Sequence, residues 1–210
     1  MALIHRATLS PTKLELLAGW LPGRDWRTAS TGEVRRVAGY RFDDPAGEVG
    51  IETMLVRVGD GPVLQVPLTY RGAPLAGADE CLIGTTDHSV LGKRWVYDAT
   101  GDPVYAAALA SAILTGSGQA EEFVQCDDRL EPREPTMGIA VGGTTDGTGD
   151  VEVGAVERVV DGDPAVLVTG AVELVVRRRL DTGTELTGAL LTGTWPGQET
   201  PAPLASVTPR

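Results

Sequence analysis

The residue types that build most catalytic centres are scarce in this chain of 210 residues, which has two His, two Cys, two Lys and no Asn. His5 and His88 are the imidazoles that could act as general bases, and Cys81 and Cys126 are the thiols that they could activate. No motif places a thiol beside an imidazole, no GxSxG elbow supplies a serine nucleophile, and the cysteine spacing fits no zinc site. The sequence therefore assigns no catalytic, cofactor-binding or metal-binding residue, and we expect no cofactor.

Two other segments have the composition of a phosphate site. Residues 142–150 contain the glycines of a phosphate-binding loop, but the Lys and the helix that normally follow are missing, so a hairpin turn is favoured. The run Arg177-Arg178-Arg179 could hold a phosphate or an acidic partner. It follows an apolar stretch, and this position favours a charged hairpin tip exposed to solvent.

Aromatic side chains make up only 5% of the chain, yet four of them gather at two places. Trp20 and Trp26 bracket the exit of the first predicted helix. Trp95 and Tyr97 are two residues apart on a predicted strand and should share one of its faces. Such groups are either anchors of the core or an amphipathic surface for a sugar ring or a protein partner. With the neighbouring charged residues and a loop histidine, the candidate ligand or partner surface consists of Trp20, Arg24, Asp25, Trp26, His88, Trp95 and Tyr97.

The elements that must position these side chains are helices and strands in the first half of the chain. A helix is predicted to begin after an N-cap at Ser10, and a second helix over residues 103–115, with Asp102 as N-cap and Gly116 as stop. The predicted strands have alternating or continuous apolar patterns, and Pro67 places one of them at an edge or a bulge. We expect both helices on one side of an antiparallel sheet whose strands cover residues 34–42, 48–58, 63–70, 94–97 and 121–126.

The second half is predicted to be almost entirely β. Four strands, at residues 137–141, 151–160, 165–177 and 185–195, alternate with turns rich in Gly, Asp and Thr and are interpreted as a meander. Residues 131–135 are the best candidate linker. We expect an α+β region at residues 1–130, a β-rich extension at 136–197 that packs on it as one globular unit, and a flexible tail at 198–210.

The formal net charge of −11 argues against nucleic acid and anionic membranes as partners. The N-terminus lacks the apolar core of a secretory signal, and the longest apolar stretch, residues 104–114, is shorter than the roughly 20 residues of a membrane span. These features predict a cytoplasmic protein.

Residues 16–26, 54–58 and 64–70 together resemble the N-terminal cap domain of actinobacterial maltokinases, and the resemblance covers about residues 13–100. A composition poor in Lys and Asn and rich in Arg, Ala, Gly and Val fits such a source. The resemblance implies a cystatin-like curved antiparallel sheet against a helix. The predicted fold class is thus α+β: a mainly antiparallel, cystatin-like sheet with two helices, plus a C-terminal β-meander layer.

The chain departs from that family after the cap. In the family, the cap precedes kinase lobes that phosphorylate maltose with ATP and magnesium, whereas here a β-rich region of about 80 residues follows. Phosphoryl transfer of this type needs an Asn for magnesium and an Asp in a His-containing loop, and neither pattern is found. The resemblance therefore implies a stand-alone module that is not an enzyme.

Two functions stay open. The first is a non-catalytic module that binds or regulates an enzyme of trehalose or α-glucan (glycogen) metabolism, such as a sugar kinase or a glucan-metabolising enzyme, or that self-associates. The alternative is a small-molecule (sugar) binding protein or an enzyme, with a pocket between sheet and helices and with His88, Trp95 and Tyr97 near its mouth. A pocket lined by Trp and His favours the alternative, and an exposed apolar patch or sheet edge favours the module.

Overall fold

The computed structural model describes residues 2–5, 7–126, 129–142, 153–183 and 185–210. It is built mainly of antiparallel β-sheet with two α-helices, which confirms the predicted α+β class, while the cystatin-like label stays a prediction. The first half of the chain forms β1 (Ala2–Ile4), β2 (Leu9–Ser10), α1 (Lys13–Trp20), β3 (Val34–Phe42), β4 (Gly50–Val58), β5 (Val63–Arg71), β6 (Leu82–His88), β7 (Gly92–Asp98), α2 (Pro103–Thr115), β8 (Glu122–Cys126) and β9 (Arg129–Arg133). The second half forms β10 (Gly138–Gly142), β11 (Val156–Val160), β12 (Ala165–Thr169), β13 (Val172–Val176), β14 (Ala189–Trp195) and β15 (Gln198–Pro209).

The first sheet has the strand order β2-β6-β7-β5-β4-β3, and all neighbouring strands are antiparallel. Pro67 lies inside β5, a strand that pairs with β4 along its length but with β7 only from Leu68 onward. On the same edge, the backbone N–H of Gln65 donates to the carbonyl of Arg178 at 2.7 Å. On this edge of β5, Pro67 therefore lies between the residue bonded to Arg178 and the stretch paired with β7. The N–H that proline lacks would face this gap, so its absence breaks no hydrogen bond of the sheet.

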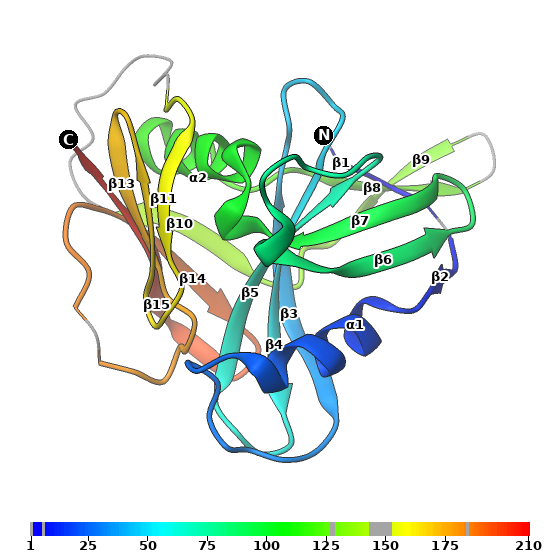
Figure 1. Ribbon diagram of the computed structural model, residues 1–210, viewed down its shortest axis with the longest axis horizontal. Coiled ribbons are helices and arrows are strands. Elements are labelled where there is room, and N and C mark those ends of the chain that lie inside the picture. Colours follow the sequence, from blue (N-terminus) through cyan, green and yellow to red (C-terminus); the bar gives the residue numbers. More distant parts are fainter. Residues whose placement is uncertain (1, 6, 127–128, 143–152, 184) are drawn as a thin grey trace.

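The two helices cover opposite faces of the first sheet, so the prediction that both pack on one side is wrong. Leu17 of α1 belongs to a cluster with Met54 and Val56 of β4, whereas Leu55, from the other face of the same strand, clusters with Leu109 of α2. Figure 1 shows α1 across the lower ends of β3 and β4, and α2 beside the second sheet. Because successive residues of a strand point to opposite faces, a strand buried on both sides is apolar along most of its length.

The start of α1 differs from the prediction, and α2 agrees with it. Ser10 ends β2, and the N-cap is Thr12, whose hydroxyl accepts from the backbone N–H of Glu15 at 3.3 Å while the Glu15 carboxylate accepts from the N–H of Thr12. This reciprocal capping box satisfies two backbone donors at the helix start. At α2 the Asp102 carboxylate caps the N-terminus, and Gly116 ends the helix with φ of 69°, a conformation that glycine adopts without strain.

The second sheet confirms the predicted C-terminal β layer but is not a simple meander. Its strand order is β10-β14-β15-β13-β12-β11, so β15 lies between β13 and β14. The stretch predicted as one strand over residues 165–177 forms the hairpin β12–β13. Its turn is stabilised by the hydroxyl of Thr169, which accepts from the backbone N–H of Val172 at 3.1 Å.

Two segments predicted to lie outside the regular structure are strands. Residues 198–210, predicted as a flexible tail, contain the central strand β15, in which Leu204, Ala205 and Val207 are buried. Residues 129–133, which overlap the predicted linker, form β9 in a third sheet of order β1-β8-β9. Prolines obscured the pattern of β15, but its register shifts next to Pro203, and a bulge of this kind tolerates proline.

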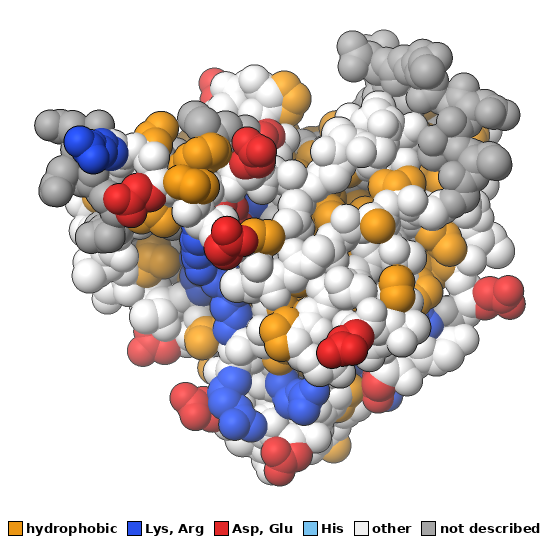
Figure 2. Space-filling view, turned by 180° about the vertical axis from the view of Figure 1, so that it is seen from behind, with side chains coloured by type: hydrophobic (Ala, Val, Ile, Leu, Met, Phe, Trp, Pro, Cys, Tyr) orange, Lys and Arg blue, Asp and Glu red, His pale blue; other side chains and the backbone are white. Residues whose placement is uncertain are grey.

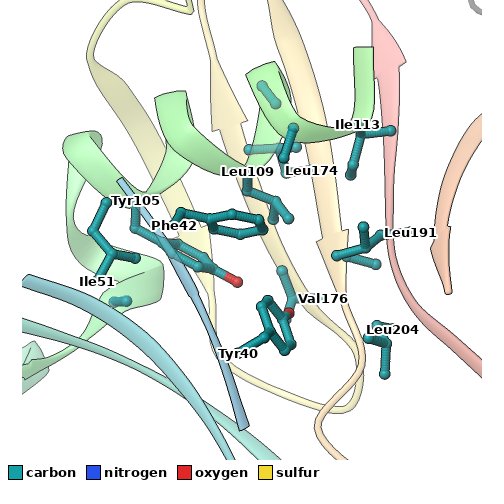
Figure 3. Close-up of a cluster of buried hydrophobic side chains, with 14 of the residues drawn as sticks. Tyr40, Phe42, Ile51, Tyr105, Leu109, Ile113, Leu174, Val176, Leu191 and Leu204 are labelled. Atoms are coloured by element: carbon teal, nitrogen blue, oxygen red, sulfur yellow. The ribbon is translucent and has the colours of Figure 1, made fainter. Parts of the chain in front are cut away.

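One hydrophobic cluster joins the two halves of the chain. Figure 3 shows Tyr40 and Phe42 of β3 and Tyr105 of α2 facing residues of the second sheet. Leu174 and Leu204, from two strands of that sheet, are both fully buried in the cluster. The first sheet, α2 and the second sheet therefore share a core.

Candidate functional site

The predicted tryptophan pair lies at the exit of α1. The two rings meet edge to face with centroids 5.8 Å apart, and Trp26 is buried, with 6% of its surface exposed. The guanidinium of Arg24 lies 5.0 Å from the ring centroid of Trp20, and Asp25 points into solvent. Of these four predicted residues, Trp26 is a core anchor, and Trp20 and Arg24 pack around it at the surface.

The same tryptophan connects the first sheet to the second. Its indole N–H donates to the carboxylate of Asp161, in the β11–β12 turn, at 2.9 Å, and Arg24 contacts the other oxygen of Asp161 at 3.4 Å. The guanidinium of Arg178 lies over the same ring, 4.9 Å from its centroid, and pairs with Asp98 at 2.5 Å and with Asp161 at 3.7 Å. These five residues, here called the Trp26 junction, contribute hydrogen bonds, ion pairs and a cation–π contact between the halves.

Replacing Trp26 with Phe should lower the free energy of unfolding by about 1 kcal/mol, because the ring stays in place while the hydrogen bond to Asp161 is lost. Replacing it with Ala should cost about 3 kcal/mol or more, since a cavity is added. Urea denaturation of the two variants measures the difference. Equal losses for the two variants would show that packing of the ring contributes nothing beyond the hydrogen bond, and a Phe variant as stable as the parent would show that the hydrogen bond contributes nothing.

The triple-arginine segment is the opposite of the predicted hairpin tip in solvent. Arg178 is fully buried, and Arg177 is 4% exposed. Only the side chain of Arg179 reaches the surface in part, where it pairs with Asp181 at 3.2 Å. Of the three arginines, Arg178 belongs to the Trp26 junction, in which Asp98 supplies the charge that makes burial of Arg178 tolerable.

The second aromatic pair stands apart from the histidine with which it was grouped. The hydroxyl of Tyr97, which is buried, accepts from the backbone N–H of Leu75 at 2.9 Å. Trp95 is half-buried under the ammonium group of Lys93, 5.1 Å from its ring centroid. The cavity that His88 lines is bounded by neither residue.

His88 instead meets His5, a contact that no motif indicated. Their ring centroids are 5.9 Å apart in an edge-to-face arrangement, and both rings line a cavity of about 450 Å³. We call it the histidine cavity. It lies between the N-terminal segment, α1, the β6–β7 hairpin and the β3–β4 turn, and its size falls in the range of small-molecule sites. Its titratable lining residues are His5, Lys13, Arg41, Asp43, Asp44, Glu48, Tyr70, His88 and Arg94.

A buried carboxylate organises the cationic wall of this cavity. Glu52 of β4 is 1% exposed and contacts the ammonium group of Lys13 and the guanidinium groups of Arg41, at 3.0 Å, and Arg36, at 3.5 Å. The hydroxyl of Tyr70 donates to it at 3.1 Å. This arrangement, here called the Glu52 cluster, holds two of the cavity's cationic residues, Lys13 and Arg41, in place. Figure 2 shows the molecule from behind, where several Lys and Arg side chains gather in a band; no His side chain is visible on this face, so the band is not the wall of the histidine cavity seen directly.

The burial and the charges shift several pKa values. Burial alone would raise the pKa of Glu52, but Lys13 and Arg41 outweigh it and hold that pKa well below its usual range. Burial, together with the Glu52 carboxylate, raises the pKa of Tyr70. Burial lowers the pKa of His88, and the nearby cationic groups of His5, Arg94 and Lys13 lower it further. At neutral pH, Glu52 is therefore ionised, and Tyr70 and His88 are neutral.

Other chemical residues of the sequence do not join this site. Cys81 is a free, half-buried thiol whose pKa is raised by burial, which makes it a poor nucleophile. The side chain of Cys126, and residues 143–152 of the glycine-rich stretch, lie outside the described residues. Within the described ranges, no three His, Cys, Asp or Glu side chains form a group that could hold a metal ion. Neither described helix has the length and apolar character needed to cross a membrane.

Comparison with known proteins identifies a family for part of the chain. Residues 20–102 match the family model described as the maltokinase N-terminal cap domain. The match runs from the last residue of α1 to the N-cap of α2 and so includes β3 to β7. The resemblance read from residues 16–26, 54–58 and 64–70 is confirmed over this region. No curated protein matches the chain.

Proposed function

We propose, from the premise that residues 20–102 form a maltokinase-cap-like domain, that the protein is a non-catalytic module that binds and regulates an enzyme of trehalose or α-glucan metabolism. The observation that carries the proposal is the family match itself. A cap domain is the N-terminal part of a maltokinase, so the enzymes that use or supply the sugar of that reaction are the expected partners. We place the protein in the cytoplasm, where those enzymes act.

An exposed apolar tip in the matched region supports a protein partner. Val90 and Leu91, in the β6–β7 turn, are adjacent large apolar residues with 57% and 44% of their surfaces exposed. Apolar side chains at a protruding turn are typical contact points in protein interfaces. Leu91 also lines the histidine cavity.

The proposal is tested by the rate of the maltokinase from the same genome, measured with and without this protein. A saturable change in kcat or KM is expected, and the V90S/L91S variant should weaken the effect. V160S is the control, because Val160 is 45% exposed on the second sheet and lies outside the matched residues 20–102. No change in the rate of the maltokinase, nor in that of the trehalose-using and glucan-forming enzymes, would contradict the proposal.

The histidine cavity favours a second candidate function, a small-molecule binding protein. Its volume of about 450 Å³ is sufficient for a sugar-sized ligand, and it contains both histidines of the chain. Titration with maltose, trehalose and glucose tests this candidate in the simplest form. Heat release with one neutral sugar, together with unchanged enzyme rates, would favour it over the regulatory module.

A further inference from the structure

We propose that the histidine cavity binds a small phosphate-bearing ligand, with the phosphate group between His88 and Arg94. This inference goes beyond the enzyme-binding proposal, because it assigns a ligand to a cavity and needs no protein partner. It stands on the direction of the hydrogen-bond donors, the charges of the walls and an arginine nitrogen without a partner.

The strand register places the two residues on one face of the β6–β7 hairpin. Arg94 lies opposite Thr86, and His88 lies two residues beyond Thr86 on the same strand. Residues two apart on a strand share a face, and diagonal neighbours on paired strands are within reach of long side chains. Both side chains line the histidine cavity.

The hydrogen bonds of His88 fix which of its nitrogens carries hydrogen. Its Nδ1 accepts from the backbone N–H groups of Val90 and Leu91 at 3.2 and 3.1 Å. A neutral imidazole that accepts at Nδ1 carries its hydrogen on Nε2. His88 therefore has one donor left, and that donor does not take part in the turn.

Arg94 has a donor in need of an acceptor. Its Nη2 donates to the carbonyl of Leu91 at 2.8 Å, whereas its Nε is buried and finds no hydrogen-bond partner among the described residues. A buried, unsatisfied donor costs free energy that an acceptor of a bound ligand would recover. Phosphate oxygens suit a guanidinium group, because two N–H donors can reach two oxygens at once.

The cations and the carboxylates that line the cavity come from different elements: Lys13 from α1, Arg41 from β3 and Arg94 from β7, and every lining carboxylate from the β3–β4 turn. Behind them, an ion-pair network has more cations than anions: the carboxylates of two glutamates are shared by four cationic side chains, which are Lys13, Arg36, Arg41 and Arg133. A phosphate would therefore be attracted to the part of the cavity lined by Lys13 and Arg94, in a protein whose formal net charge is −11.

The acidic side chains that line the cavity indicate which kind of compound would carry the phosphate group. Asp43, Asp44 and Glu48 line the cavity from the β3–β4 turn, and the Asp44 carboxylate already accepts from three backbone N–H groups of that turn. Carboxylates repel a phosphate but accept hydrogen bonds from hydroxyl groups. The ligand that fits both walls is a phosphate monoester of a polyhydroxyl compound, with its hydroxyl groups toward the turn.

Calorimetric titration at low ionic strength tests the inference with three probes: glucose 6-phosphate, inorganic phosphate and glucose. Glucose 6-phosphate should bind most tightly, inorganic phosphate more weakly, and glucose should release no heat. Equal binding of the two phosphates would still support the phosphate site, with inorganic phosphate as its source. Glucose binding as tight as that of its phosphate, or no binding of either phosphate, would overturn the inference.

Matched variants locate the site. Arg94→Gln should weaken phosphate binding about tenfold or more, because a charged donor pair is lost. His88→Asn keeps an oxygen that can accept from the β6–β7 turn but loses the Nε2 donor, so it should weaken binding as well. Lys93→Gln removes the same charge from the adjacent residue, which does not line the cavity, and should bind like the parent protein. Losses as large for Lys93→Gln as for Arg94→Gln would show a general charge effect and contradict the site.

Discussion

Replacing Glu52 with Gln is expected to lower the free energy of unfolding by about 3 kcal/mol or more, since removing one partner of a buried ion pair leaves the others uncompensated. Lys13, Arg36 and Arg41 would then face one another with no carboxylate between them. Urea denaturation at pH 7 measures the loss. Glu48→Gln is the matched control, because Glu48 is exposed on the adjoining turn and its replacement should change stability by less than about 0.5 kcal/mol.

The pH dependence of stability gives an independent test of the same residue. The pKa of Glu52 is lower in the folded than in the unfolded chain, so its contribution is present above the ordinary value of 4.5 and is lost as the pH falls toward the depressed folded value. The parent protein should therefore lose stability below about pH 4.5 more steeply than Glu52→Gln. If the free energy of unfolding fell equally steeply with pH in the two proteins, the lowered pKa of Glu52 would be contradicted.

Replacing Arg178 with Met should cost about 3 to 5 kcal/mol, because the Asp98 carboxylate, with 7% of its side chain exposed, would stay buried without its cation. The indole of Trp26 would also lose its cation–π contact. Adding Asp98→Asn to the same chain should recover part of the loss by removing the unpaired charge. Urea denaturation measures both steps.

Arg179→Met is the control for this experiment. Arg179 pairs with Asp181 at the surface, and partly exposed ion pairs contribute about 1 kcal/mol or less. If Arg178→Met and Arg179→Met were equally mild, the buried pair would not be what joins the second sheet to the first at this point.

The parts of the fold that the sequence predicted well depend on local signals. The bounds of α2 follow from an N-cap at Asp102 and a glycine stop at Gly116, and both caps are found. The hairpin β3–β4 follows from two β-rich runs and a turn between them. Signals of this kind lie within a few residues of the element that they define, so one sequence is sufficient.

The errors concern interactions between residues far apart in the chain. Arg178 is predicted in solvent because the three arginines follow an apolar stretch, where a charged hairpin tip is favoured, but its partner Asp98 lies 80 positions away. The strand β15 is predicted as a tail because its prolines interrupt the alternating pattern of a strand. The strands that pair with it, β13 and β14, lie earlier in the chain, so residues 198–209 alone do not reveal the pairing. A buried charge or a proline in a strand is tolerated only through such partners, which a sequence alone does not reveal.

The candidate site was predicted only in part. His88 was identified, but its contact with His5 depends on the N-terminal segment lying against the β6–β7 hairpin. The sequence does contain one signal for the cationic wall. Glu52 stands in a strand that is otherwise almost entirely buried, and an acidic residue in such a strand needs cations on the same face.

Sedimentation velocity tests whether this cap-like protein binds an enzyme of trehalose or α-glucan metabolism. The purified chain is mixed with the maltokinase of the same genome and, in separate runs, with the trehalose-using and glucan-forming enzymes of that genome. A new, faster-sedimenting species is expected with at least one of them, and its amount should fall with the V90S/L91S variant and not with V160S. Boundaries that equal the sum of the separate proteins in every mixture would contradict it, and a faster species formed by this chain alone would point to self-association instead.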